Sequence, residues 1–229
     1  MGQCEICQES HIFEDLDGCR YAFPMEAGQA RRDAAPVPSR VLRRARPGDA
    51  VDFALDTFMS CERVDMQTLA ARLDVSPATL YRWFGSRAQL LDHVCGRLTE
   101  QFSDAALRDA GGKGDERVCG YARHIMLASI SSEPIRSFVA REQQVALRLF
   151  LRRDSAVHRL LAARTLELIA EGRPGAARSD LEETAHLIVQ VATAMMWATF
   201  LVGDEPEPEA TVEIIRTLLA SRGGQARVG

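Results

Sequence analysis

Long apolar runs are missing from this sequence, although 46% of its 229 residues are hydrophobic. No stretch of eighteen apolar residues occurs, so no transmembrane helix is expected. The first residues are acidic and lack the apolar segment of a secretory signal, which predicts a cytoplasmic protein. Strand patterns and internal repeats are missing as well, whereas apolar residues recur at helical spacing along most of the chain. The sequence therefore predicts an all-α fold.

Motifs that carry catalysis are also missing. The chain has no Gly-x-Ser-x-Gly, no His-Glu-x-x-His, no phosphate-binding glycine loop and no convincing pair of carboxylates. Its acidic and histidine residues are scattered over the expected helix surfaces. We therefore expect no catalytic site, no cofactor and no enzymatic activity.

Six cysteines are present, and in a cytoplasmic protein they are expected to be reduced. Cys95 and Cys119 fall on apolar helix faces, which favours core positions. An N-terminal set of four soft ligands has the number, but not the familiar spacing, of a zinc site: Cys4, Cys7, His11 and Cys19. Two interpretations stay open for it, a metal or thiol sensor and a disordered tail.

Charge is distributed unevenly, and the net value of −4 hides this. Residues 1–30 hold one arginine against six acidic residues, whereas residues 31–97 hold eleven arginines against eight. Local positive charge is what a phosphate-binding surface requires. Six of these arginines precede the first expected helix: Arg31, Arg32, Arg40, Arg43, Arg44 and Arg46. This run is either a solvated disordered segment or an arm that follows DNA phosphates or enters a minor groove.

The stretch from Asp65 to Arg87 predicts two short helices joined by a tight turn, followed directly by a third helix. Asp65 is a suitable N-cap, and Met66, Leu69, Ala70 and Leu73 form one apolar face. Ser76 and Pro77 open the second helix, and Gly85 suits its C-terminal cap. Leu80 and Phe84 are expected to point inward, leaving small and hydrogen-bonding residues outward. Such a braced helix fits a DNA major groove.

The chain resembles the tetracycline-repressor-like (TetR) family of bacterial transcription regulators. The resemblance extends over about a fifth of the chain, from Val51 to about Leu98. It rests on an ordered set of motifs: Ala54-Leu-Asp-Thr-Phe58, Leu69-Ala70, Val75-Ser76, Thr79-Leu80-Tyr81, Phe84-Gly85-Ser86-Arg87 and Leu90-Leu91. The chain departs from the family at Pro77, where a basic residue is frequent, and at Trp83, where histidine or tyrosine is frequent. The resemblance implies a regulator that binds double-stranded operator DNA.

The outward residues of this segment are candidate DNA contacts. Ala78 and Thr79 lie where base edges and thymine methyl groups are reached, and Arg82 is placed for a guanine or a phosphate. Tyr81 and Trp83 resemble phosphate-contacting positions of the family, and Arg87 is placed to bind a phosphate at a helix start. The full set of predicted contacts is Arg43, Arg44, Arg46, Ser76, Ala78, Thr79, Tyr81, Arg82, Trp83 and Arg87.

About nine helices and three segments are expected. Residues 1–39 read as a disordered extension with a basic end, residues 40–97 as the helix-turn-helix DNA-binding domain, and residues 98–229 as an effector-binding and dimerisation domain. The expected helices after the DNA-binding motif cover about 87–109, 115–131, 134–150, 154–172, 179–202 and 208–221.

The helix near residues 187–202 is apolar almost all round, so it must be buried on two sides. One side can face its own domain. The other can face a second copy, with the last helix beside it, which predicts a homodimer through residues 180–221. The alternative is a monomer in which this helix is the central core helix.

A small-molecule effector of unknown identity is the expected partner of residues 98–229. Polar residues among apolar ones can orient a ligand in a pocket, or can be satisfied within the core or across the dimer. The candidates by position are His124, Phe138, Arg141, His158, His186, Gln190, Thr193 and Trp197. The leading function is a repressor released from a palindromic operator by this effector. The alternatives are a constitutive DNA binder without an effector and a metal or thiol sensor.

Overall fold

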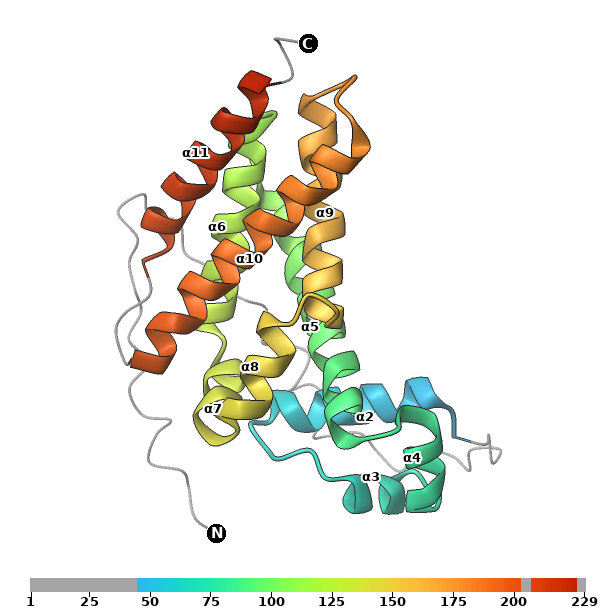
Figure 1. Cartoon of the computed structure of the whole chain (residues 1–229). Coiled ribbons are helices and arrows are strands. Elements are labelled where there is room, and N and C mark those ends of the chain that lie inside the picture. The colour runs from blue at the N-terminus through green and yellow to red at the C-terminus, as the bar shows by residue number, and fades with distance from the viewer. Residues whose placement is uncertain (1–44, 203–206, 226–229) are drawn as a thin grey trace. The chain divides into compact units, whose positions relative to one another are not determined.

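The computed structural model describes residues 45–202 and 207–225, and all regular elements within them are α-helices. The predicted all-α fold is thereby confirmed (Figure 1). Among the described residues, no helix is both long and apolar enough to cross a membrane. The helices are α2 (Pro47–Met59), α3 (Met66–Arg72), α4 (Pro77–Phe84), α5 (Arg87–Asp109), α6 (Asp115–Ser131), α7 (Glu133–Arg141), α8 (Gln143–Leu151), α9 (Ala156–Gly172), α10 (Arg178–Val202) and α11 (Pro208–Gln225).

The first helices form a small cluster around a common core. α2 packs on α5, and α3 packs on α4 (Figure 1). Phe58 of α2, Leu80 of α4 and Leu90 of α5 are almost completely buried there. The apolar positions expected from helical spacing in this segment are therefore the positions that the fold buries.

The long helix α5 leaves this cluster and enters the second group of helices. Its first half packs on α2 and α4, and the whole helix also contacts α6 and α9. The boundary predicted at residue 97 falls inside this unbroken helix, so the division into two domains stays a prediction.

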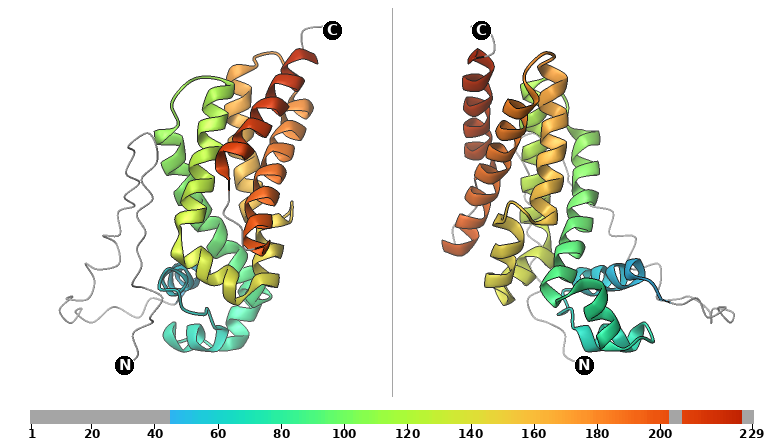
Figure 2. Two further views of the ribbon diagram at one scale, coloured as in Figure 1. Left: turned by 90° about the vertical axis from the view of Figure 1, so that its left-hand side faces the viewer. Right: turned by 45° about the vertical axis from the view of Figure 1, so that its right-hand side comes forward.

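Helices α6 and α9 pack on α5, and α10 and α11 pack on these two helices and on each other. α9 and α10 pack against each other, and α11 lies beside both α6 and α10 (Figure 2). One side of α10 is buried in this group, through Ile188, Val189, Met196 and Trp197.

Three features differ from the sequence-based expectation, which gives one helix over 134–150 and takes Asp115 and Asp154 as the N-caps of the helices that follow them. The helix expected over 134–150 is two helices, because the chain breaks at Glu142 (φ −133°, ψ 46°). No glycine or proline marks this break, and an ion pair to Arg87 holds Glu142 there. The N-cap of α9 is Ser155 rather than Asp154, since its Oγ accepts from the His158 N–H at 3.1 Å. The N-cap of α6 is Gly114 rather than Asp115.

Candidate DNA-binding surface and ligand pocket

Helices α3 and α4 are fixed at their starts by side-chain caps. Asp65 Oδ1 accepts hydrogen bonds from the N–H groups of Gln67 (3.0 Å) and Thr68 (2.9 Å). The bond from Thr68 holds the pKa of the Asp65 carboxyl below its usual value, so the charge stays at the positive end of α3. Ser76 Oγ accepts from the Thr79 N–H at 3.2 Å and opens α4. Both predicted caps are present, and they hold the two helices in a helix-turn-helix arrangement.

The outward face of α4 consists of the residues that the sequence placed there. Leu80 and Phe84 are buried, whereas Ala78, Tyr81 and Arg82 are exposed, with Tyr81 51% exposed. Thr79 is half-buried and its hydroxyl lies 3.0 Å from Ser76 Oγ. The exposed Tyr81 ring and the exposed Arg82 guanidinium are suited to contact DNA phosphates and base edges.

Trp83 and Gly85 shape the end of this helix. Trp83 is half-buried, and its ring meets the Phe84 ring edge-on at 6.4 Å between centroids. Gly85 has φ 73°, a left-handed conformation that glycine adopts without steric cost. α4 therefore ends at Phe84, with the predicted cap at Gly85, and α5 begins at Arg87.

Arg87, a predicted phosphate contact, is paired with an acidic side chain in the structure. Its guanidinium forms a two-pronged ion pair with the Glu142 carboxylate, at 2.5 Å and 2.7 Å, and its Nε donates to the Val64 carbonyl. Only 21% of the Arg87 side chain and 13% of the Glu142 side chain are exposed. A phosphate contact by Arg87 would require this pair to open.

Of the predicted basic arm, only Arg46 belongs to the described residues. It is exposed at the N-cap of α2, where its backbone N–H donates to Asp49 Oδ2 at 2.7 Å. Arg43 and Arg44 lie outside the described residues, as do Cys4, Cys7, His11 and Cys19. Within the part of the chain that the structure describes, no group of three potential metal ligands is found.

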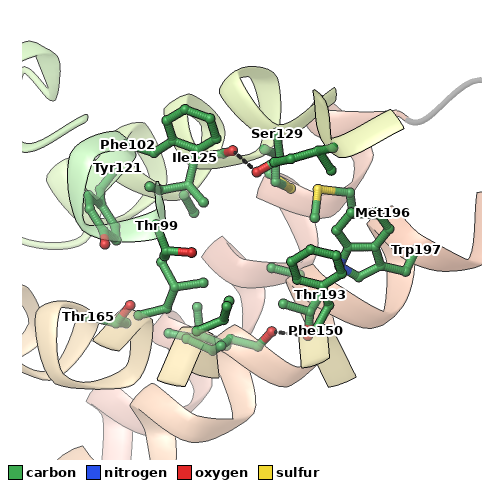
Figure 3. A pocket seen from close by; sticks show the side chains of 18 residues that line it. Thr99, Phe102, Tyr121, Ile125, Ser129, Phe150, Thr165, Thr193, Met196 and Trp197 are labelled. Atoms are coloured by element: carbon green, nitrogen blue, oxygen red, sulfur yellow. Dashed lines mark hydrogen bonds between the residues drawn. The ribbon is translucent and has the colours of Figure 1, made fainter. Parts of the chain in front are cut away.

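A partly open, mostly apolar cavity lies between α5, α6, α7, α8, α9 and α10 (Figure 3). Its volume is about 50 Å³, room for a few water-sized groups, since a single water needs roughly 10–15 Å³ on this scale. Of the described residues that line it, none has a charged side chain. The lining is Thr99, Phe102, Tyr121, Ala122, Ile125, Met126, Ser129, Ile135, Phe150, Val157, Leu161, Thr165, Ile188, Val189, Ala192, Thr193, Met196 and Trp197.

The polar groups of the cavity are few and mostly engaged within their own helices. Thr99, Ser129 and Thr193 each donate a hydrogen bond to the carbonyl four residues earlier, at 2.7–2.8 Å. The Tyr121 hydroxyl lies 2.9 Å from Ser103 Oγ, and burial raises the pKa of Tyr121 to about 12. The cavity is therefore electrically neutral at physiological pH.

Two of the eight predicted ligand residues, Thr193 and Trp197, line this cavity, and the other six do not. Phe138 is buried between the Phe58 and Phe150 rings, and Arg141 is an exposed residue that donates to the Cys61 carbonyl. Gln190 is exposed on the outer side of α10. His124 is half-buried, with Nδ1 2.8 Å from the Gly120 carbonyl of its own helix.

His158 and His186 form a pair beside the cavity. Their rings are stacked at 5.3 Å with 12° between planes, and His158 Nε2 lies 3.1 Å from His186 Nδ1. His158 is completely buried and His186 half-buried. The two ring nitrogens that face each other are paired, whereas the buried His158 Nδ1 has no hydrogen-bond partner within the described part of the chain.

Most residues that line the cavity were not predicted from the sequence, because the predicted ligand residues were chosen mainly for their polar side chains and the lining is mostly apolar. Thr99, Phe102 and Met126 belong to helix faces that periodicity assigns to the core, and nothing in the periodic pattern marks a gap in that core. The one available signal was the run of hydroxyl residues on apolar faces, at Thr99, Ser129 and Thr165.

The arrangement of α3 and α4, with a second group of helices around a mostly apolar cavity, defines the class: a helix-turn-helix regulator with a helical C-terminal domain. Residues 61–94 match the family model described as bacterial regulatory proteins of the tetR family. Residues 113–220 match the model of the tetracyclin repressor-like C-terminal domain. The chain belongs to the TetR family of bacterial transcription regulators, as its sequence motifs predicted. Because members of this family are transcription regulators, the prediction that the protein is not an enzyme is confirmed.

Solved structures of the same family are similar to this chain. The TetR-family transcriptional repressor QsdR of R. erythropolis is 27% identical, with a TM-score of 0.70 over 76% of this chain and 94% of that chain. A TetR-like transcriptional regulator from Rhodococcus sp. RHA1 is 21% identical, with a TM-score of 0.41 over 79% and 96% of the two chains. No curated protein sequence matches the chain.

Proposed function

We propose that this protein is a dimeric repressor that binds a palindromic operator and leaves it when a small neutral molecule fills the cavity. One observation carries the proposal: the same chain combines an exposed, braced α4 with a mostly apolar cavity whose described lining residues bear no charge. The first feature suits DNA and the second suits an effector.

In this proposal residues 40–97 bind DNA, and residues 98–229 bind the effector and the second copy. Ala78 and Thr79 read base edges near the start of α4, and Arg82 reaches a guanine or a phosphate. Ser76, Tyr81 and Trp83 border the phosphate backbone, and Arg46 begins α2 beside it. Arg43 and Arg44, which precede the described residues, are proposed to contact DNA as well.

The dimer interface is proposed on α10 and α11. Gln190, Ala194 and Ala198 are exposed at a spacing of four on α10, which places them on one stripe. Ile214 on α11 is 40% exposed. Small residues let two copies of α10 approach closely about a two-fold axis. A two-fold dimer also suits DNA, because it can place two α4 helices in successive major grooves about 34–36 Å apart.

The effector is proposed to be uncharged and mostly apolar. A charged group transferred into this cavity would lose its hydration, and no side chain there bears a compensating charge. Such a ligand releases DNA only through a difference in its affinity for the two states of the dimer. A typical coupling changes operator affinity about 5- to 150-fold.

The test begins with selection of bound duplexes from a random pool, which we expect to yield a palindromic consensus. The same experiment with Thr79→Ala is expected to change the preferred bases within each half-site. A consensus without two-fold symmetry, or no enrichment at all at low salt, would remove the proposal.

The effector's class is tested with two probes that are small enough for the cavity and differ in one charged group, 1-butanol and butyrate. We expect 1-butanol to raise the melting temperature and to weaken binding to the selected duplex, and butyrate to do neither. Fluorescence of Trp197, in a Trp83→Phe background, reports entry into the cavity. Preference for butyrate would refute the neutral effector. Release by neither probe, nor by other uncharged compounds, would leave a constitutive DNA binder.

A further inference from the structure

The corner between α7 and α8 touches both the cavity and the DNA-binding helices. α8 packs on α5, α9 and α10, whereas α7 packs on α2 and α6. In Figure 1 the two helices lie between α2 and the lower end of α10. The α7–α8 corner therefore contacts both the helices that line the cavity and α2 of the DNA-binding segment. In the proposed function, effector binding at the first must change DNA binding by the second.

Aromatic rings form a continuous series through this corner. Trp197 and Phe150 line the cavity and are stacked, with centroids 4.3 Å apart and 10° between planes (Figure 3). The Phe150 ring meets the Phe138 ring edge-on at 6.4 Å, and Phe138 meets Phe58 of α2 at 5.3 Å. An occupant that moves the stack at the cavity must also move rings that touch α2, because a close-packed interior transmits displacement.

A polar cluster fixes the same corner to the helix-turn-helix segment. Glu142, the residue at the corner, holds Arg87 at the first position of α5 by two short bonds. Arg87 in turn donates to the Val64 carbonyl, just before α3, and Arg141 donates to the Cys61 carbonyl. Residues 61–64, which lead into α3, are thus tied to the corner by hydrogen bonds from these two arginines.

This ion pair is a strong one for a protein surface region. It is bidentate and mostly buried, and the hydrogen bonds from Arg87 keep the pKa of Glu142 below its usual value. Opening it would leave a charge in a half-buried site, which is costly. The two helices on either side of the corner therefore have one favoured placement relative to α3 and α4.

From these contacts we propose that Arg87 and Glu142 are positioning residues that report the state of the cavity to the DNA-binding helices, through Phe150 and Phe138. The proposal rests on the proposed function, since it assumes that the cavity and the operator are coupled. It departs from the simpler route in which α5 alone carries the change. In it, Arg87 acts on DNA indirectly, by holding α3 and α4 in place.

The experiment is a double-mutant cycle on binding to the selected duplex, and it needs no effector. Trp197→Phe removes the indole that stacks on Phe150, and Glu142→Gln removes the charge that holds Arg87. Each single variant is expected to weaken duplex binding at least fivefold. In the double variant, Trp197→Phe is expected to lower duplex affinity by less than twofold beyond the effect of Glu142→Gln. The reason is that the ion pair through which Trp197 would act on α3 is already absent.

Two controls separate positioning from other roles. Glu133→Gln removes a carboxylate charge at the start of α7, from the exposed ion pair with Arg136, and should leave binding within twofold. The salt slope of binding should be unchanged in Glu142→Gln, because no phosphate contact is lost. If Glu142→Gln destabilises the fold, Arg87→Lys replaces it, since lysine cannot chelate both carboxylate oxygens.

Several outcomes would overturn the inference. Multiplicative effects of the two substitutions would mean that cavity and corner act independently. Tighter binding by Glu142→Gln would mean that Glu142 competes with phosphate for Arg87. If Trp197→Phe binds the duplex as tightly as the wild type does, the stack of Trp197 on Phe150 is not coupled to DNA binding. Wild-type protein that binds no duplex would instead refute the proposed function.

Discussion

At the scale of single residues, the buried histidine pair has a pH dependence that the structure defines. Burial, with further contributions from His186 and Arg153, lowers the pKa of His158 to about 4. An unfolded histidine titrates near 6.5. His158 is therefore neutral in the folded protein at neutral pH, and its stacked contact with His186 does not carry two charges.

The stability of the protein should fall as the pH is lowered from about 6.5 to about 4, because over this range the unfolded chain binds a proton at residue 158 and the folded chain does not. The contribution is fully present above about pH 6.5. We expect His158→Gln to flatten the dependence, measured as the free energy of urea unfolding at half-unit steps of pH.

His93→Gln is the matched control, because His93 is exposed on α5. It should retain the wild-type slope between pH 4 and 6.5. An equal slope in wild type and His158→Gln would show that His158 is not the group that titrates.

At the scale of helices, the crossing of α5 and α9 depends on a glycine. A β-carbon at Gly96 would lie 2.8 Å from the Ala156 β-carbon, closer than two such atoms can approach. On the same side of α5, Asp92 Oδ1 accepts from the Ala156 N–H at 2.9 Å and so caps the start of α9. The hydrogen bond and the close approach fix the spacing of two helices that both line the cavity.

Gly96→Ala should therefore destabilise the protein by about 1–3 kcal/mol, as expected for overpacking, despite the better helix propensity of alanine. Gly48→Ala makes the same change in α2, where nothing lies within 4 Å of the new methyl group. It should be neutral or stabilise by up to ~1 kcal/mol. Both free energies come from urea unfolding, and a similar effect of the two substitutions would contradict the close approach of α5 and α9.

Also at this scale, the break between α7 and α8 illustrates the limit of periodicity. Ile135, Phe138, Leu149 and Phe150 follow one helical pattern through the break, so the sequence predicted a single helix. The pattern records which residues are buried and not whether the backbone between them is continuous. Glu142 is held at the break by Arg87, a residue 55 positions away in sequence.

At the scale of the whole molecule, the proposed dimer is the feature on which operator binding depends. A glutamate at position 194 of each copy would place two like charges near the axis of an α10–α10 contact, away from water. Ala194→Glu should therefore shift the protein to monomer in analytical ultracentrifugation and weaken binding to the palindromic duplex at least tenfold.

The matched control is Ala163→Glu, which adds the same charge on an exposed position of α9. It should leave both the sedimentation and the duplex binding unchanged. A dimer that survives Ala194→Glu with full affinity would place the interface elsewhere.

The sequence by itself determined the helical class, the caps at Asp65 and Ser76, and the outward residues of α4, because all of these depend on interactions within a few positions along the chain. It also carried the family, through motifs confined to that local segment. The tertiary structure alone decided what Arg87 binds, where the helix after Pro134 breaks, and which residues enclose the cavity. Each of these depends on groups that only folding brings together, and periodicity gives the direction of a side chain but not the identity of its neighbour.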